Sequence, residues 1–214
     1  IMDSALQNMK KAVESVEMKT IGFFMIAMIV VSVISVIIYF KQLKQLSVDK
    51  ILAQFKPTKI TSFKPNKTLK KGDEPFKLYD YYVKSSYNSC ASSDFSNSYV
   101  DLRALNNVIK NGARFLDFEV YSMNKMKPVI AVSNDPSIHV KQSFNHLEFD
   151  AVMEEIKNNA FTSESGCPNP GDPLFLHFRV KSNHKTVYDE MAKILTGKFD
   201  TEHQLLGKEF SNAF

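Results

Sequence analysis

Two segments with the alternation of a β-strand carry the side chains that could do chemistry. Strand side chains point alternately to the two faces of a sheet, so residues two apart share a face. Residues 113–121 place two carboxylates on one such face, and residues 173–181 place an imidazole and two cations on one. These groups can bind a phosphate or a metal ion, or they can pair with one another inside the protein. The residues are Asp117 and Glu119 in the first segment and His177, Arg179 and Lys181 in the second.

Alternating strand-like and helical segments must position these side chains. Helical patterns at 100–111, 150–160 and 184–196 separate strand patterns at 78–86, 113–121, 128–133 and 173–181. Gly112 and Gly197 are predicted to end two of the helices, and Asp150 is predicted to cap the start of another. Strands that alternate with helices pair in parallel, which predicts an α/β fold.

A partial (β/α) barrel of the TIM type is the predicted architecture. In such a barrel the apolar strand faces pack on helices, and alternate strands supply the same layers of the interior. We therefore predict that Asp117 and Glu119 meet Arg179, with the other charged residues of the second segment close by. A complete barrel needs about 250 residues. The α/β domain at 76–214 is thus expected to hold about the first four βα units of a longer protein, a complete small α/β domain being the alternative.

A stretch without charged side chains, residues 21–40, precedes this domain. About 20 apolar residues in a helix span the hydrocarbon layer of a membrane. A secretory signal peptide has an apolar region of about 7–15 residues and a small-residue cleavage site, whereas this stretch ends in Tyr39-Phe40-Lys41. A core helix of a soluble protein is rarely apolar on every face. We predict one transmembrane helix, preceded by an amphipathic segment at 1–20 that continues it or lies at the interface.

Residues 41–75 are predicted to form a lysine-rich tether. Nine lysines and one acidic residue, Asp49, occur in 41–72, although the net charge of the whole chain is only +4. Lysines next to a membrane helix attract anionic lipid headgroups, by about 1 kcal/mol each near the surface; an extended, solvated linker is the alternative. Because the positive charge is local and no aromatic stacking pattern is interleaved with it, we predict no nucleic-acid partner.

The cellular compartment of the α/β domain is poorly determined by the sequence. Three lysines lie in residues 1–20 and four in residues 41–56, a difference of one that favours the cytosolic side. Cys90 and Cys167 occur in no metal-binding spacing. They are compatible with two free thiols or with one disulfide.

Four short motifs follow one another in the second half of the chain. They are SSYN at 85–88, GARFLDFE at 112–119, KPVI at 127–130 and PLFLHFR at 173–179, with a helical segment ending in Ala-Phe at 151–161. In this order they resemble the phosphatidylinositol-specific phospholipase C X domain, whose corresponding motifs include SSHN and GxRxxELD. The sequences of these motifs are similar in particular to those of the divergent branch found in large DNA viruses and in their algal or protist hosts.

The resemblance implies a phosphodiesterase whose two histidines act as general base and general acid on a phosphoinositide. Proton transfer of this kind needs groups that titrate near the working pH. The first histidine position holds Tyr87, and a tyrosine with an ordinary pKa of about 10 is a poor base. The second position falls at Val132 and Ser133, where no histidine occurs. His139 lies further on, and we interpret it as a surface residue.

The resemblance also implies a calcium site, of which three ligands remain. Asn88, Asp117 and Glu119 occupy ligand positions, with the two acids exchanged in type, whereas Arg179 places a cation at the fourth. We therefore expect that the calcium cofactor is lost and that the chain is a pseudoenzyme. The charged residues would then form an internal ion-pair network, or a phosphate-binding relic made of Asn88 together with the three charged residues of 173–181.

Three functional hypotheses remain open from the sequence. The first is a membrane-anchored scaffold, in concrete terms a virion membrane or minor capsid component that ties an internal membrane, or a host endomembrane, to other structural proteins. The second is a phosphodiesterase with unconventional proton carriers such as Tyr87 and His177. The third is a catalytically silent module that binds lipid headgroups.

Overall fold

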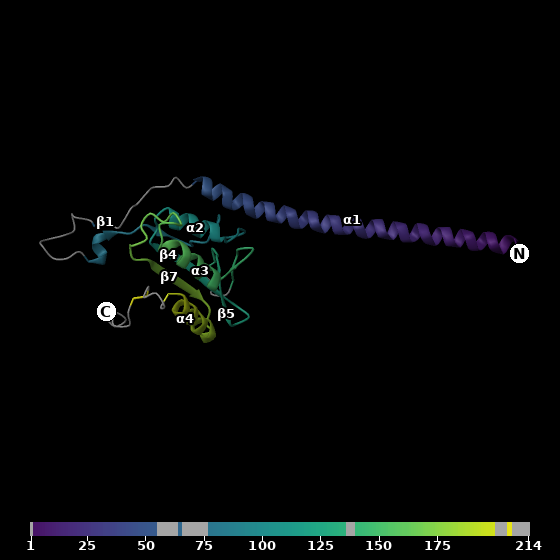
Figure 1. Ribbon diagram of the computed structural model, residues 1–214. Coiled ribbons are helices and arrows are strands. Elements are labelled where there is room, and N and C mark those ends of the chain that lie inside the picture. The colour runs from purple at the N-terminus through teal and green to yellow at the C-terminus, as the bar shows by residue number, and fades with distance from the viewer. Residues whose placement is uncertain (1, 55–63, 66–76, 136–139, 200–204, 207–214) are drawn as a thin grey trace. The chain divides into compact units, whose positions relative to one another are not determined.

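The protein is represented by a computed structural model, which describes residues 2–54, 64–65, 77–135, 140–199 and 205–206. Two compact units divide the chain, Ile1–Leu46 and Ser47–Phe214. The first unit is helical, and the second contains the sheet that carries the predicted site (Figure 1).

One continuous helix, α1 (Met2–Gln54), includes the two predicted N-terminal segments and continues into the predicted tether. Within it, Met18–Leu43 is long and apolar enough to cross a membrane, and its apolar side chains are exposed. The hydroxyls of Ser32 and Ser35 donate to the carbonyls four residues earlier, at 2.9 and 2.8 Å, so neither lacks a partner in an apolar surrounding. The helix is therefore compatible with a single membrane span.

The second unit is built on strand β4 (Phe115–Met123), which pairs with three other strands. It is parallel to β3 (Ser85–Ser86) and to β7 (Phe175–Lys181), and antiparallel to β5 (Lys127–Ala131). Strand β6 (Leu147–Glu148) continues the sheet beyond β5. A separate two-stranded sheet joins β1 (Lys64–Pro65) to β2 (Tyr81–Tyr82). The helices are α2 (Leu102–Lys110), α3 (Phe149–Ala160) and α4 (Lys185–Phe199).

This arrangement confirms the predicted α/β fold with a partial barrel, because the sheet curls as half of a barrel does. Within the five-stranded sheet, β5 departs from parallel pairing and is antiparallel to both of its neighbours, β4 and β6. β5 returns along β4 as a hairpin, whose turn contains Asn124 and Lys125 with φ of 51° and 62°. Two successive positive φ angles are typical of the tight turn that joins antiparallel strands. Such a turn leaves no room for the helix that a parallel connection requires.

The other local predictions are partly wrong, each for a visible reason. The predicted strand at 78–86 is interrupted by a 3₁₀ turn, η1 (Leu78–Asp80), because the Asp80 carboxylate accepts the Lys77 N–H at 2.8 Å. Helix α3 begins at Phe149, so Asp150 lies in its first turn and is not the cap. Helix α4 continues past Gly197, because Lys198 forms ion pairs with Asp150 (2.9 Å) and Glu154 (2.8 Å).

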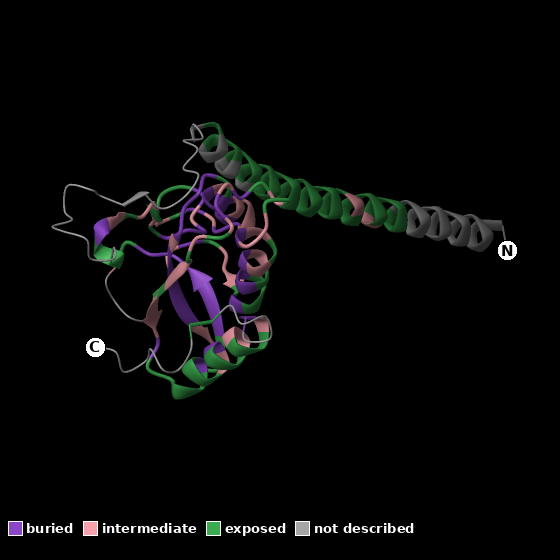
Figure 2. Ribbon diagram, turned by 60° about the vertical axis from the view of Figure 1, so that its left-hand side comes forward, coloured by how far each residue is buried: buried purple, intermediate pink, exposed green. Residues whose placement is uncertain are grey.

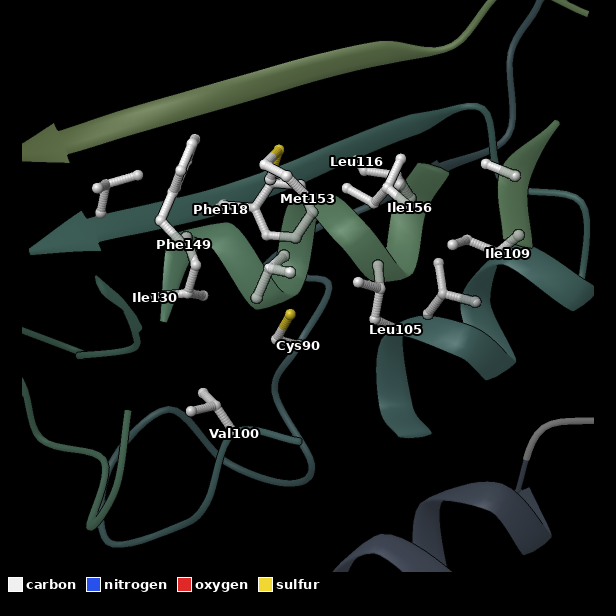
Figure 3. Close-up of a cluster of buried hydrophobic side chains, with 14 of the residues drawn as sticks. Cys90, Val100, Leu105, Ile109, Leu116, Phe118, Ile130, Phe149, Met153 and Ile156 are labelled. Carbon is white, nitrogen blue, oxygen red and sulfur yellow. The ribbon is translucent and has the colours of Figure 1, made fainter. Parts of the chain in front are cut away.

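The apolar face of the sheet packs on the helices and forms the core. Leu116 and Phe118 of β4 meet Met153 and Ile156 of α3, with Leu105 of α2 beside them (Figure 3). Figure 2 shows the same division, with β4 and β5 largely buried, β7 only partly buried, and the helices exposed on their outer sides. The opposite face of β4 is also buried but polar, since the side chains alternate. That face carries the predicted site.

A buried arginine joins the start of β4 to the end of α3. Arg114 has no exposed surface, and its guanidinium donates to the backbone carbonyls of Ala160 (2.7 Å), Asp172 and Pro173 (3.4 Å). Burial lowers the pKa of Arg114. The Phe161 ring lies 5.7 Å from the guanidinium carbon. The arginine thus donates to the carbonyl of the buried Ala160 at the end of α3 and to two carbonyls of a partly exposed loop.

Substitution of Arg114 by methionine tests this role. The methionine keeps much of the volume but removes the guanidinium from the carbonyls of Ala160, Asp172 and Pro173, of which only the first belongs to a buried residue. We expect the free energy of unfolding to fall by about 1–3 kcal/mol, the cost of removing a donor from a buried group, measured by urea titration of the full chain in detergent micelles. Lys193→Met, whose side chain is 78% exposed, is the control, with an expected change of less than about 0.5 kcal/mol. Equal stability of the two variants contradicts the assignment.

Candidate functional site

The predicted charged residues meet on the inner face of the sheet. The register pairs Asp117 with His177 and Glu119 with Arg179 across β4 and β7. Lys181 pairs with Tyr121, two residues further along the same strands. Residues that are paired across neighbouring strands point to the same face of the sheet. The strand alternation therefore brings four of these groups into direct contact: Asp117, Glu119, His177 and Arg179.

The guanidinium of Arg179 is the centre of the site. Its Nε donates to Asp117 Oδ2 at 3.0 Å, and its Nη2 donates to Asp117 Oδ1 at 2.7 Å. The same Nη2 donates to Asn88 Oδ1 at 2.7 Å, and Nη1 donates to Glu119 Oε1 at 2.6 Å. The two bonds to Asp117 form a bidentate pair, the strongest arrangement of an arginine with a carboxylate. One cation thus binds both acids and the amide.

Each carboxylate has further donors that hold it in place. Asp117 Oδ1 accepts the Asn88 N–H at 3.1 Å, and Oδ2 lies 2.7 Å from His177 Nδ1. Glu119 Oε2 accepts the Tyr121 hydroxyl at 2.8 Å and the Ser133 N–H at 3.1 Å. Both oxygens of each acid are therefore hydrogen-bonded, as buried carboxylates require.

A turn with a left-handed residue brings Asn88 to the site. Asn88 has φ of 46°, a conformation that asparagine tolerates better than most residues. After this turn the Ser89 N–H donates to the Asp117 carbonyl at 2.8 Å, and the Ser89 hydroxyl accepts the Asp117 N–H at 3.1 Å. The end of β3 is therefore bonded to both the backbone and the side chain of Asp117. Nothing in the sequence pattern indicates this role of Ser89, because it follows a left-handed residue in a turn and belongs to no alternating strand segment.

The network changes the acidity of its members. Asp117 and Glu119 are 4% and 2% exposed. Burial would raise the pKa of Asp117, but the hydrogen bonds from Arg179, Asn88 and His177 and the charge of Arg179 hold that pKa below its ordinary value. Burial lowers the pKa of Arg179, and its two carboxylate partners more than compensate, so the pKa is raised. Burial and the contact with Glu119 raise the pKa of Tyr121. Asp117 and Arg179 are therefore held in their charged forms as an ion pair.

The oxygens that would bind calcium are already occupied by donors. Calcium takes six to eight oxygen ligands and no hydrogen-bond donor. In this chain Asn88 Oδ1, both oxygens of Asp117 and one of Glu119 accept hydrogen bonds from Arg179. The guanidinium lies where a cation held by these three residues would bind. The residues present do not fit a calcium ion.

The two predicted histidine positions are filled by side chains with other roles. The Tyr87 ring covers Arg179, with 4.3 Å between the guanidinium carbon and the ring centroid, and contacts Phe95 at 5.3 Å. Val132 is buried in the core, and Ser133 contributes its backbone N–H to Glu119 and accepts the Asp135 N–H at 2.9 Å. His139 lies outside the described residues. Neither position supplies an imidazole to the site.

One imidazole does reach the site from β7. His177 places Nδ1 against Asp117, while its side chain remains 53% exposed. An imidazole oriented by a carboxylate through Nδ1 can exchange a proton at its other nitrogen. The Phe115 ring lies 5.9 Å from the imidazole. His177 is thus the only imidazole among the described residues that contacts this network.

Comparison with known proteins agrees with the motifs. The family model of the phosphatidylinositol-specific phospholipase C X domain matches residues 75–209. Among solved structures, those of PLC21 from S. officinalis and from L. pealei are similar, each with 18% identity and a TM-score of 0.48. The two similarities cover 60% and 61% of this chain, respectively, and 15% of the length of each PLC21 chain. The chain therefore spans a small part of these proteins. No curated protein matches its sequence.

Removal of the central cation should destabilise the fold in a pH-dependent way. Arg179→Met leaves two buried carboxylates without a cation, and breaking a buried pair in this way costs about 3–5 kcal/mol. In the native chain the lowered pKa of Asp117 stabilises the fold above the ordinary carboxyl pKa, and this contribution is lost as pH falls through the folded pKa. We expect the full loss at about pH 7 and a much smaller one at about pH 4, because burial without a cation favours the protonated form of the variant's carboxyls. Urea titration of both chains at the two pH values measures it.

Arg179→Glu separates the ion-pair network from a relic metal site. We expect this variant to be less stable than Arg179→Met at neutral pH, because it adds a third carboxylate to the cluster. Calcium should not restore its stability if the residues are arranged only for the guanidinium. A calcium-dependent recovery of the free energy of unfolding contradicts this view.

Proposed function

Because the chain belongs to the phosphatidylinositol-specific phospholipase C X domain family, we propose that it is a membrane-anchored member that does not carry out the family's calcium-dependent cleavage. The contact that carries this proposal is the binding of Arg179 to Asn88, Asp117 and Glu119. These oxygens are the ones that the metal would need. The protein acts instead as a scaffold beside its membrane.

The loss of acid–base groups supports the same proposal. Tyr87 and the Val132–Ser133 pair stand where the family's histidines are expected. Loss of one general acid or base typically lowers a rate by 10²–10⁴-fold. Losing both groups, and the metal as well, leaves little rate enhancement for a phosphodiester. The fold is retained because its inner face is satisfied by the ion-pair network.

Membrane anchoring by α1 is the second part of the proposal. Met18–Leu43 has the length and composition of a membrane span, and the lysines of 41–72 can contact anionic headgroups beyond it. The finer role that we propose is to join a membrane to other structural proteins, as a virion membrane or minor capsid component would. The motifs that resemble the viral branch of the family support it.

A phosphodiesterase with a displaced base is the second candidate. The observation that favours it is the 2.7 Å contact between His177 Nδ1 and Asp117, with the imidazole half exposed. In this reaction His177 would accept the proton of the attacking hydroxyl, and Arg179 would neutralise the phosphate. Arg179 already neutralises two carboxylates, so little of its charge is left for a phosphate. This balance favours the scaffold. A catalytically silent module that binds lipid headgroups would also need the positive charge of Arg179, which is already paired with two carboxylates. The same balance therefore argues against it.

A lipid-cleavage assay tests the proposal. The full chain, reconstituted in vesicles that contain phosphatidylinositol, is expected to release no inositol phosphate above the rate of protein-free vesicles, with or without calcium. Loss of both acid–base groups, at 10²–10⁴-fold each, places the rate near that background. Turnover that His177→Gln abolishes, and that the exposed control His184→Gln retains, establishes the second candidate instead.

Membrane extraction tests the anchor separately. A chain held by a transmembrane helix stays in the membrane fraction in alkaline carbonate, because the helix is buried in hydrocarbon. We expect the full chain to remain in the pellet and a chain that begins at Ser47 to be released. Release of the full chain excludes the anchor without affecting the conclusion on catalysis.

A further inference from the structure

A short exposed segment near the start of the α/β domain, before the strands of the larger sheet, carries aromatic and basic side chains outside the candidate site. It comprises η1 and β2, between Lys77 and Tyr82. The capping contacts of η1 are the Asp80 N–H to the Lys77 carbonyl (2.9 Å) and the Lys77 N–H to the Asp80 carboxylate (2.8 Å). These two bonds close the turn. They also determine which side chains point inward.

The turn places its acid inside and its apolar side chains outside. Asp80 is 6% exposed, whereas Leu78, Tyr79 and Tyr82 are 55%, 73% and 69% exposed. The ammonium of Lys77 lies 5.9 Å from the centroid of the Tyr79 ring. We call Lys77, Leu78, Tyr79 and Tyr82 the tyrosine–lysine patch. Asp80 is the one acidic residue between positions 77 and 86, so the outer surface of this segment is apolar and cationic.

The patch is paired with the lysine-rich tether. Strand β1, from the tether, is antiparallel to β2, with Lys64 opposite Tyr82 and Pro65 opposite Tyr81. This pairing brings a tether lysine to the position next to a patch tyrosine. The tether in turn follows the helix that can cross a membrane. The patch is thus joined to the tether through a β-ladder, and the tether follows the proposed anchor along the chain.

We infer that the tyrosine–lysine patch is a second membrane contact, which lays the α/β unit on an anionic bilayer. Tyrosine is enriched at membrane interfaces, because its ring enters the apolar layer while its hydroxyl stays in water. Lysines near the surface attract anionic headgroups. The patch combines these two side-chain types without an exposed acid. The inference rests on the proposed anchoring by α1, since that helix keeps the patch close to a membrane.

The chain allows a direct measurement, because it contains no tryptophan. A Tyr79→Trp variant of the full chain carries one probe in the patch, and Phe144→Trp carries one at a position that is 60% exposed in the loop between β5 and β6. Both are reconstituted in vesicles of phosphatidylcholine with phosphatidylserine, with and without brominated acyl chains. We expect bromine to quench the probe at position 79 and to leave the probe at position 144 bright.

The charge of the patch is tested in the same system. Lys77→Gln in the Tyr79→Trp background should lower the equilibrium constant for contact about fivefold, the effect of one lysine near an anionic surface. Vesicles of phosphatidylcholine alone should reduce the quenching for the same reason. Quenching that is independent of Lys77 and of phosphatidylserine overturns the electrostatic part and with it the inference.

Flotation separates failure of the patch from failure of the anchor. If the Tyr79→Trp chain floats with the vesicles but its probe is not quenched, the anchor stands and the patch inference is wrong. Equal quenching of both probes, or quenching at position 144 alone, also overturns it. If neither chain floats, the proposed anchoring by α1 fails, and the inference that depends on it fails for that separate reason.

Discussion

Two buried carboxylates on neighbouring positions of one strand face are the constraint on which this domain depends. Asp117 and Glu119 lie two residues apart on β4, almost without exposure. An ionised carboxylate in such a place needs a cation and hydrogen-bond donors, or it becomes protonated. A bound metal would meet this need from outside the chain. Here Arg179 of β7 meets it from inside, through four hydrogen bonds to three residues.

The choice of an internal cation has structural consequences. Arg179 belongs to β7, Asn88 follows β3, and both bind Asp117 of β4, so one network joins three strands. The apolar face of the same strands is held by α2 and α3. The sheet is therefore stabilised on its inner face by charge and on its outer face by burial. The guanidinium of Arg179 is engaged by Asn88 and the two carboxylates and is therefore not available to bind a substrate. This engagement links the fold to the proposed non-catalytic function.

The parts that could be predicted are those with a strong period. The two-residue alternation in β4 and β7 placed Asp117, Glu119 and Arg179 on one face, and their contact follows once the strands are adjacent. The direction of β5 could not be predicted, because it depends on two residues of positive φ in the turn at Asn124 and Lys125. The role of Ser89 was also inaccessible, since Ser89 lies in the turn after Asn88, where no two-residue alternation indicates which way a side chain points.

Two arginines, one buried and one partly buried, show why a charged residue inside a domain has to be interpreted through its partners. Arg114 is bound to backbone carbonyls, and burial lowers its pKa. Arg179 is bound to two carboxylates, which raise its pKa and leave a quarter of its side chain exposed under Tyr87. Arg114 joins a strand to a loop, and Arg179 lies where a metal cation held by the same residues would bind. Because the inner-face charges satisfy one another, the membrane contact that we propose is assigned to groups outside the network, namely the exposed tyrosines and Lys77 near the start of the α/β domain.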